Sequence, residues 1–113
     1  MPFDTSVTQG YHPNYQAGGY PYTSPVGSFP ANGYGLHDMA GNIYEWCWDW
    51  YGDYAGNYQT DPRGPTIGQY GAYRVLRGGS WIDDALNARV ANRYNNDPVY
   101  EGINSGFRCA RGL

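Results

Sequence analysis

Residues 35–46 read GLHDMAGNIYEW, and this stretch decides the fold together with two shorter motifs further along the chain. The two motifs are RGGSW at residues 77–81 and GFR at residues 106–108. The paired glycines of RGGSW allow the backbone to bend or to approach a neighbouring segment closely. Each motif alone is weak evidence, whereas their order and spacing together are specific.

The composition describes one small domain that relies on aromatic side chains for its core. The chain has 113 residues, and its 17 glycines, 8 prolines and 13 tyrosines argue against a helical bundle. Its net charge of −3 argues against a nucleic-acid partner or an anionic membrane surface. No apolar run approaches about 18 residues and no signal peptide is visible, so we predict no membrane insertion. The compartment and the oligomeric state stay open, and display on a cell or virus surface through a partner is allowed.

Alternating residue types predict three strands. Trp46, Trp48 and Trp50 alternate with more polar residues, which is typical of a strand with one indole face. Residues 74–77 (RVLR) form a second alternating run, and residues 105–110 predict a strand that closes the chain. Few further elements are expected, so the pattern indicates a small α+β domain in which loops outweigh regular structure.

The segments between these strands are rich in turn-forming residues. Residues 24–29 predict a short extended piece, and the sequence NNDP at residues 95–98 predicts a turn. Residues 83–90 are compatible with a short helical turn or with an irregular loop. Residues 1–23 predict an irregular arm, although a disordered tail over residues 1–20 is the alternative.

The two cysteines and two histidines carry no strong signal for chemistry. Cys47 and Cys109 are read as small buried hydrophobic residues, and a disulfide between them is left open because it requires close Cα atoms. Two cysteines without a nearby histidine pair do not make a zinc site. His37 is expected to be a packed loop residue.

The three motifs resemble the C-terminal half of the formylglycine-generating enzyme (sulfatase-modifying factor) family. The sequence SPVGSFPAN at residues 24–32 also resembles the family, so the resemblance covers about residues 24–112. It implies an α+β fold of the C-type lectin-like type, with a small antiparallel sheet, long ordered loops and little helix. We therefore expect a minimal domain of this kind over residues 24–113, preceded by the arm at residues 1–23.

The resemblance implies a structural calcium site in the first motif. The matching positions are Asp38, Gly41, Ile43 and Glu45, which would offer side-chain and backbone oxygens. Calcium is a hard cation that prefers such ligands. The alternative is that the carboxylates of Asp38 and Glu45 cap backbone N–H groups of the loop without any metal.

The resemblance also locates the oxidase centre of the family, and this chain departs from it. The family's oxidases carry two copper-binding cysteines shortly after the Gly-Gly-Ser-aromatic motif, and thiolates suit Cu(I). Residues 82–89 contain no cysteine, and Asp83 and Ala88 stand at the matching places. The related iron-dependent sulfoxide synthases need a histidine cluster that His12 and His37 cannot supply. We therefore expect no copper, no catalytic residues and no enzyme activity.

The segment between RGGSW and GFR is rich in asparagine, at positions Asn87, Asn92, Asn95, Asn96 and Asn104. In this it resembles the variable proteins of diversity-generating retroelements, which use the same scaffold. Their variable positions lie between these motifs and derive from asparagine-coding templates, although asparagine is also a common loop residue. Arg89, Arg93 and Arg108 are expected to brace the scaffold by bonding loop carbonyls or carboxylates such as Asp49. The predicted ligand-contacting residues are Ile82, Asp83, Asp84, Leu86, Asn87, Val90, Asn92, Tyr94, Asn95, Asn96, Val99, Tyr100, Glu101 and Asn104.

The sequence thus favours a non-catalytic binding module that presents residues 82–105 to a protein ligand. Loops on a rigid scaffold change side chains without disturbing the core, and Tyr, Asn and Ser are adaptable contact residues. For Tyr94 and Tyr100, ordinary half-buried packing is the alternative. Two other functions stay open: a degenerate or partner-dependent oxidase of the same family, and a calcium-dependent sugar-binding domain. The missing cysteine pair counts against the first, and the missing Glu-Pro-Asn or Gln-Pro-Asp loop counts against the second.

Overall fold

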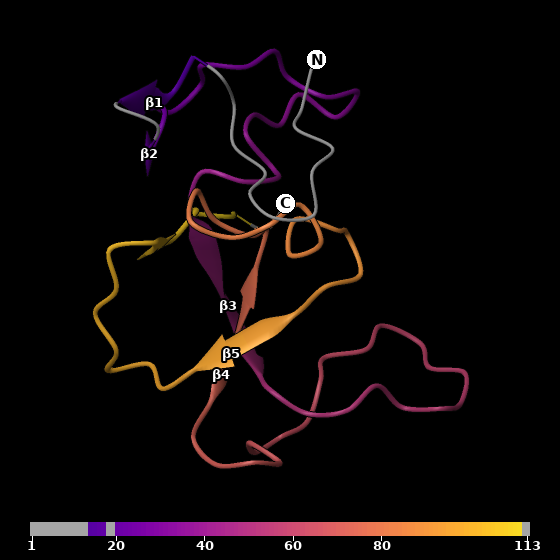
Figure 1. Ribbon diagram of the computed structural model, residues 1–113. Coiled ribbons are helices and arrows are strands. Elements are labelled where there is room, and N and C mark those ends of the chain that lie inside the picture. Colours follow the sequence, from indigo (N-terminus) through magenta and orange to yellow (C-terminus); the bar gives the residue numbers. More distant parts are fainter. Residues whose placement is uncertain (1–13, 18–19, 112–113) are drawn as a thin grey trace.

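The computed structural model describes residues 14–17 and 20–111 (Figure 1). Most of the arm predicted for residues 1–23 therefore lies outside the described residues. The described part contains six strands and no helix. The strands are β1 (Gln16–Ala17), β2 (Tyr20–Pro21), β3 (Tyr44–Trp50), β4 (Arg74–Arg77), β5 (Tyr94–Asn96) and β6 (Ser105–Gly106).

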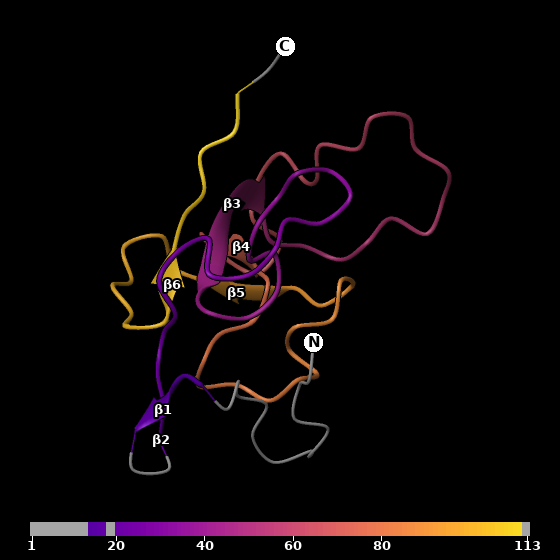
Figure 2. The same cartoon turned by 90° about the horizontal axis from the view of Figure 1, so that it is seen from above.

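Four of these strands form the central sheet in the order β5-β4-β3-β6. The pairs β3–β4 and β4–β5 are antiparallel, as expected, whereas β6 runs parallel to β3. The sheet is therefore mixed rather than purely antiparallel. The reason is that residues 97–104 carry the chain around the sheet, so β6 reaches the far side of β3 in the same direction as β3 (Figures 1 and 2).

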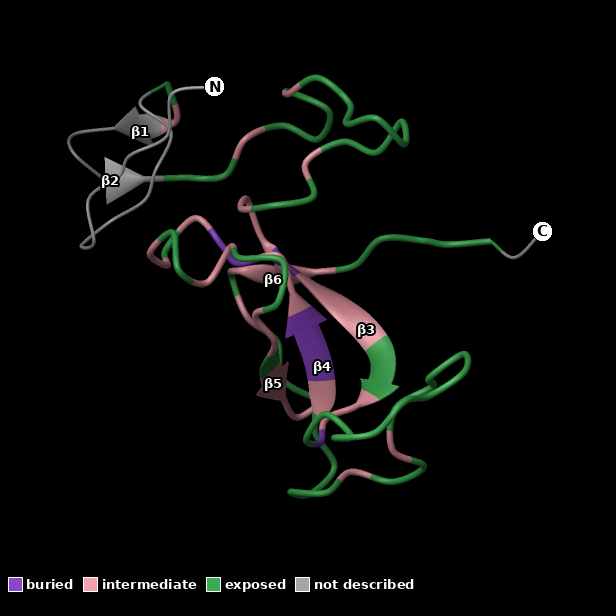
Figure 3. Ribbon diagram, turned by 90° about the vertical axis from the view of Figure 1, so that its right-hand side faces the viewer, coloured by how far each residue is buried: buried purple, intermediate pink, exposed green. Residues whose placement is uncertain are grey.

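The core lies where β3 and β4 meet. Tyr44, Val75 and Leu76 are buried, with exposures of 3%, 3% and 1% (Figure 3). The indole face of β3 is only partly covered, because Trp48 is 86% exposed. The guanidinium carbon of Arg74 lies 3.5 Å from the ring centroid of Trp50 and 4.8 Å from that of Trp48. A cation thus covers part of this face in place of aliphatic side chains.

The predictions for β3 and β4 are confirmed, and three other predictions need correction. The closing strand is only Ser105–Gly106, because residues 107–110 have no strand partner among the described residues. The turn expected at residues 95–98 falls later, since Tyr100 N donates to Asp97 O and residues 95–96 belong to β5. Residues 24–29 contain a turn at residues 26–27 instead of an extended piece. For residues 83–90 the sequence left a short helical turn or an irregular loop open, and the structure has an irregular loop of successive turns.

The paired glycines of RGGSW hold the following loop against the sheet. Gly79 has a φ of +74°, a conformation that costs other residues free energy. A Cβ at this position would lie 2.9 Å from the backbone nitrogen of Ala88. The loop after RGGSW therefore packs directly on the glycine backbone, in agreement with the close approach expected from the sequence.

Candidate functional site

The segment between RGGSW and GFR forms two loops at opposite ends of β5 (Figures 1 and 2). We call residues 82–92, before β5, the braced arm, and residues 97–103, after β5, the open arm. The predicted contact surface at residues 82–105 is therefore divided by β5 into two parts. Each part has a different relation to the sheet.

The polar side chains of the braced arm bond the arm's own backbone. Asp84 Oδ1 accepts hydrogen bonds from Leu86 N at 3.0 Å and from Asn87 Nδ2 at 3.2 Å. Asn92 Nδ2 donates to Asn87 O at 3.1 Å. Asp83 accepts a hydrogen bond from the hydroxyl of buried Ser80. Their predicted contact with a ligand stays a prediction, and in this structure their side chains also hold the shape of the loop.

The sheet reaches across to the same arm through arginine side chains. Arg77 Nη1 at the end of β4 donates to the backbone oxygens of Val90 at 2.8 Å and Asn92 at 3.0 Å. Arg89 Nε donates to Leu86 O at 2.9 Å within the arm. Hydrogen bonds from a charged group are stronger than neutral ones, so the backbone here is firmly fixed.

Two further arginines show the bracing role expected from the sequence. Arg93 Nη2 donates to Gly52 O at 2.8 Å, and its guanidinium lies 3.8 Å from the ring centroid of Tyr54. Arg108 forms two hydrogen bonds with the Glu45 carboxylate, at 2.6 and 2.9 Å. Carbonyl oxygens and Glu45 are the acceptors, and no bond from these arginines to Asp49 is found within the described residues.

Tyr94 in β5 serves the core as well as the surface. Its ring stacks on that of buried Tyr44, with centroids 5.4 Å apart and an interplanar angle of 23°. Burial, followed by the nearby Asp83 carboxylate, raises the pKa of Tyr44 to about 12. The Tyr44 hydroxyl thus stays protonated at neutral pH. Half-buried packing, the alternative considered for Tyr94, describes one face of this ring.

Asp97 is the one side chain of the open arm that bonds the arm's backbone within the described residues. Val99 N donates to Asp97 Oδ1 at 3.0 Å, and Ser105 N donates to Gly102 O at 3.3 Å. Val99 is 83% exposed and Tyr100 is 49% exposed. No hydrogen bond or ion pair is recorded for the side chains of residues 99–103 within the described part of the chain.

The predicted contact residues thus divide into exposed and half-buried groups. The exposed residues are Ile82, Leu86, Val90, Tyr94, Val99, Tyr100 and Glu101. The half-buried residues are Asp83, Asp84, Asn87, Asn92, Asn95, Asn96 and Asn104. Ile103, which is 81% exposed, is not among the predicted contact residues, although an isolated apolar residue between Gly102 and Asn104 was a usable signal.

The residues of the calcium prediction lie on one tightly curled loop. Asp38, Gly41 and Asn42 have φ values of 52°, 81° and 68°. Gly27 N donates to Asp38 Oδ2 at 2.5 Å, whereas Asp38 Oδ1 is buried without a hydrogen-bond partner in the described structure. Trp81 Nε1 is the other such atom. An orphaned carboxylate oxygen is the kind of atom that a cation satisfies.

Glu45, the second carboxylate of that set, is already paired. Arg108 binds both of its oxygens and also approaches Asp38 O at 3.4 Å. A carboxylate has about four lone-pair positions, so the pair leaves room for a further ligand bond. The described residues contain no group of three or more His, Cys, Asp or Glu side chains that could hold a metal. A cation here would thus depend on backbone carbonyls as well as Asp38 and Glu45, and such a donor set fits calcium.

The cysteines give no sign of a reactive thiol pair. Both are free, so the disulfide left open by the sequence does not form. Cys47 is half-buried in β3, and burial raises the pKa of its thiol, which disfavours the nucleophilic thiolate. Cys109 is exposed, which corrects the prediction that it is buried.

The described residues also contain no helix long and apolar enough to cross a membrane.

A small mixed sheet that supports long, hydrogen-bonded loops defines a domain of the C-type lectin-like type. The chain belongs to the sulfatase-modifying factor family: the family model "Sulfatase-modifying factor enzyme 1-like domain" matches residues 4–113. The match includes residues 4–23, most of which lie outside the described residues. The division into an arm and a domain at residue 24 stays a prediction.

Several known proteins are similar to this chain. A region of the serine/threonine-protein kinase pkn1 of Chlamydia caviae is 48% identical over 80% of this chain and 15% of its own length. The formylglycine-generating enzyme of Streptomyces coelicolor is 46% identical over 88% of this chain and 32% of its own length. The inactive C-alpha-formylglycine-generating enzyme 2 of Bos taurus is 39% identical over 99% of this chain and 35% of its own length. This chain therefore spans about a third of these relatives or less.

Among solved structures, Treponema denticola variable protein 1 is similar in both sequence and fold. It superposes with a TM-score of 0.68 at 42% identity, over 76% of this chain and 31% of that chain. The relatives include enzymes, a protein named inactive and a variable protein. Membership of the family therefore does not by itself establish an activity.

Proposed function

We propose that this chain is a non-catalytic binding module that presents exposed side chains of residues 82–105 to a protein ligand. One observation carries the proposal: exposed apolar side chains stand on a backbone that other residues fix. Leu86 is 53% exposed and Val90 is 97% exposed, yet Arg77 and Asp84 hold the backbone beside them. Such a surface accepts substitution without loss of the fold.

The similarity to a variable protein supports the finer proposal that retroelement diversification acts on this surface. Sequencing the gene from many individuals of the source population tests it. We expect substitutions at exposed positions such as Ile82, Leu86 and Val99, with the braces Asp84 and Arg77 unchanged. A gene that is uniform across the population would contradict diversification and leave a fixed-ligand module.

The main competing function is oxidation of a cysteine peptide, as in the active relatives. The absence of cysteine in residues 82–89 and the raised pKa of the Cys47 thiol count against it. The decisive experiment loads the protein with copper and incubates it with a cysteine-containing peptide under air. Unchanged peptide by mass spectrometry supports the binding module, whereas conversion of the cysteine to formylglycine would overturn it.

A structural calcium ion is a second, independent proposal, favoured by the unpartnered Asp38 Oδ1. Asp38 and Glu45, with the carbonyls of Gly41 and Ile43, would hold the ion and tie the first motif together. Calcium should raise the melting temperature of the wild type relative to chelator, and Asp38→Asn should abolish most of that difference. Asp38→Asn is a conservative change, because Gly27 N can still donate to the amide oxygen. An equal melting temperature of the wild type in calcium and in chelator would contradict the site.

A further inference from the structure

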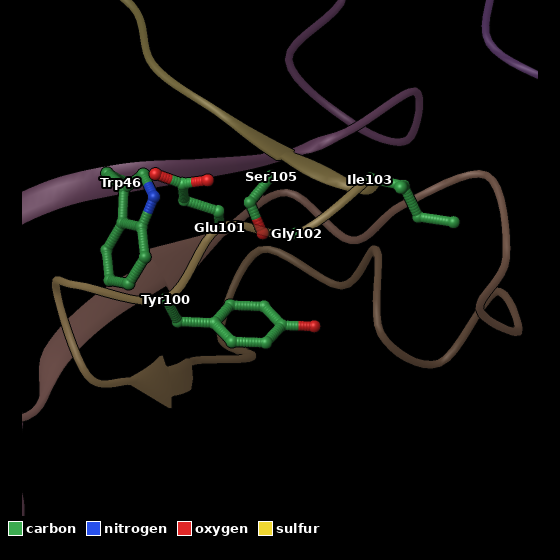
Figure 4. Close-up of a pocket in the computed structure, with 6 residues that line it drawn as sticks. All are labelled: Trp46, Tyr100, Glu101, Gly102, Ile103 and Ser105. Atoms are coloured by element: carbon green, nitrogen blue, oxygen red, sulfur yellow. The ribbon is translucent and has the colours of Figure 1, made fainter.

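A hollow at the surface lies between β3 and the open arm. It is an open groove of about 430 Å³ (Figure 4). Its lining residues are Trp46 of β3, Ser105 of β6, and Tyr100, Glu101, Gly102 and Ile103 of the open arm. The residues that line the groove include none of the four proposed to hold calcium and none of the braced arm.

The parallel pairing of β6 with β3 builds this groove. Tyr44 pairs with Ser105, and Glu45 pairs with Gly106, so Trp46 follows directly beside the end of β6. The open arm enters β6 through the hydrogen bond from Ser105 N to Gly102 O. One wall of the groove therefore belongs to the sheet, and the other belongs to the loop.

Gly102 sets the position of the Tyr100 ring. A Cβ at Gly102 would lie 2.5 Å from Tyr100 Cε1 and 3.1 Å from Asn104 Oδ1. The ring can lie against the backbone of the loop only because residue 102 lacks a side chain. The glycine at position 102 therefore determines where the Tyr100 ring lies in the groove.

Glu101 is the charged residue among those that line the groove, so the lining carries a negative charge. Glu101 is exposed, and the ion pair found within the described residues joins Arg108 to Glu45 instead. Arg77 and Arg93 are directed at backbone carbonyls near the other arm. The net charge of the chain, −3, has the same sign.

We propose that this groove binds the cationic head of an arginine or lysine side chain on the protein ligand, with Trp46 and Tyr100 as aromatic walls and Glu101 as the counter-ion. Indole and phenol rings attract cations over their faces, and tryptophan does so best. The adjacent carboxylate adds charge complementarity that a neutral side chain cannot use. The inference rests on the proposed binding function and names the chemistry of its ligand.

The test uses capped tripeptides as probes and the tryptophan indole N–H signals as the readout. The full chain, labelled with ¹⁵N, is titrated with Ac-Gly-Arg-Gly-NH₂ and Ac-Gly-Lys-Gly-NH₂, and Trp46→Phe assigns the Trp46 signal. We expect that signal to shift and saturate with the cationic peptides. The neutral peptides with citrulline or acetyl-lysine should leave it in place. The cationic peptide that binds with the higher affinity identifies the preferred head group.

Glu101→Gln should weaken binding about three- to tenfold, since it removes the counter-ion from a partly desolvated cation site. Asp97→Asn is the matched control, because it removes the same charge from the same arm outside the groove and keeps an oxygen for Val99 N. Gly102→Ala should also weaken binding by displacing the Tyr100 ring while Glu101 stays in place.

Absence of a shift, equal shifts with the neutral peptides, or equal losses from Glu101→Gln and Asp97→Asn would each overturn the cation groove. Those results leave the binding module itself standing, because population sequencing and the peptide-oxidation assay test that function without using this groove. Conversion of a cysteine peptide, by contrast, would overturn the module whatever the titration gives.

Discussion

The two arms lie between the same two motifs, RGGSW and GFR, yet they differ in how the chain fixes them. In the braced arm, Asp84 and Asn92 bond the loop backbone, and Arg77 reaches it from the sheet. In the open arm, Val99, Tyr100 and Ile103 are exposed, and Asp97 is the one side chain found to bond the arm's backbone within the described residues. The comparison teaches that tolerance to substitution is graded by position: polar residues in the first arm are structural, whereas most side chains of the second are free.

Leu76→Ala acts on the sheet from which both arms extend, and it should have the largest effect. Leu76 is 1% exposed and pairs with Trp46 on one side and Tyr94 on the other. We expect a loss of about 2–5 kcal/mol in the free energy of unfolding, measured by denaturant titration. Leu86→Ala is the matched control, because the same atoms are removed from a side chain that is 53% exposed. Equal losses from both variants would show that the core is not centred on β4.

Gly79→Ala tests the contact between the sheet and the braced arm alone. The alanine would have to adopt the positive φ of Gly79, and its Cβ would lie 2.9 Å from Ala88 N. The braced arm therefore has to move. We expect a cost of about 1–3 kcal/mol and faster amide exchange in residues 82–92, with the open arm unchanged. Gly56→Ala is the control, since nothing lies within 4 Å of its Cβ position. Faster exchange in both arms alike would contradict their independence.

Asp84→Ala removes the side chain that bonds Leu86 N and Asn87 Nδ2. We expect a cost of about 0.5–2 kcal/mol, comparable to the loss of a capping residue. Glu101→Ala removes an equal charge from the open arm, where no side-chain bond is lost, and should leave the melting temperature nearly unchanged. Equal losses of melting temperature in Asp84→Ala and Glu101→Ala would contradict the distinction between the arms.

The sequence predicted the parts of the fold that depend on local patterns. Strand β3 follows from alternating tryptophans and β4 from the run at residues 74–77, and both are confirmed. Strand β5 was missed because Asn95 and Asn96 have weak strand propensity, and pairing with β4 overrides it. Long-range pairing of this kind leaves no periodicity in the segment itself.

The division between braces and exposed residues was equally hard to predict. Asparagine at positions 87 and 95 looks the same in sequence, and its partners depend on how the loop folds. The Asn104 side chain, which donates to Ser80 Oγ at 3.4 Å, joins residues 24 positions apart. By contrast, bracing by Arg93 and Arg108 was predicted correctly, because arginines beside turn-rich segments have many carbonyl acceptors.

The smallest effect is expected from Val99→Ser combined with Ile103→Ser in the open arm. These side chains are 83% and 81% exposed, so the free energy of unfolding should change by no more than about 0.5 kcal/mol. Ile43→Ser, in a half-buried position beside Gly106, is the control and should destabilise the chain. A loss above about 1 kcal/mol for the double variant would mean that these residues pack in the folded chain and are not free for a ligand. An unchanged free energy of unfolding would instead show that these exposed apolar side chains have no structural role, which leaves them available for contact with a partner.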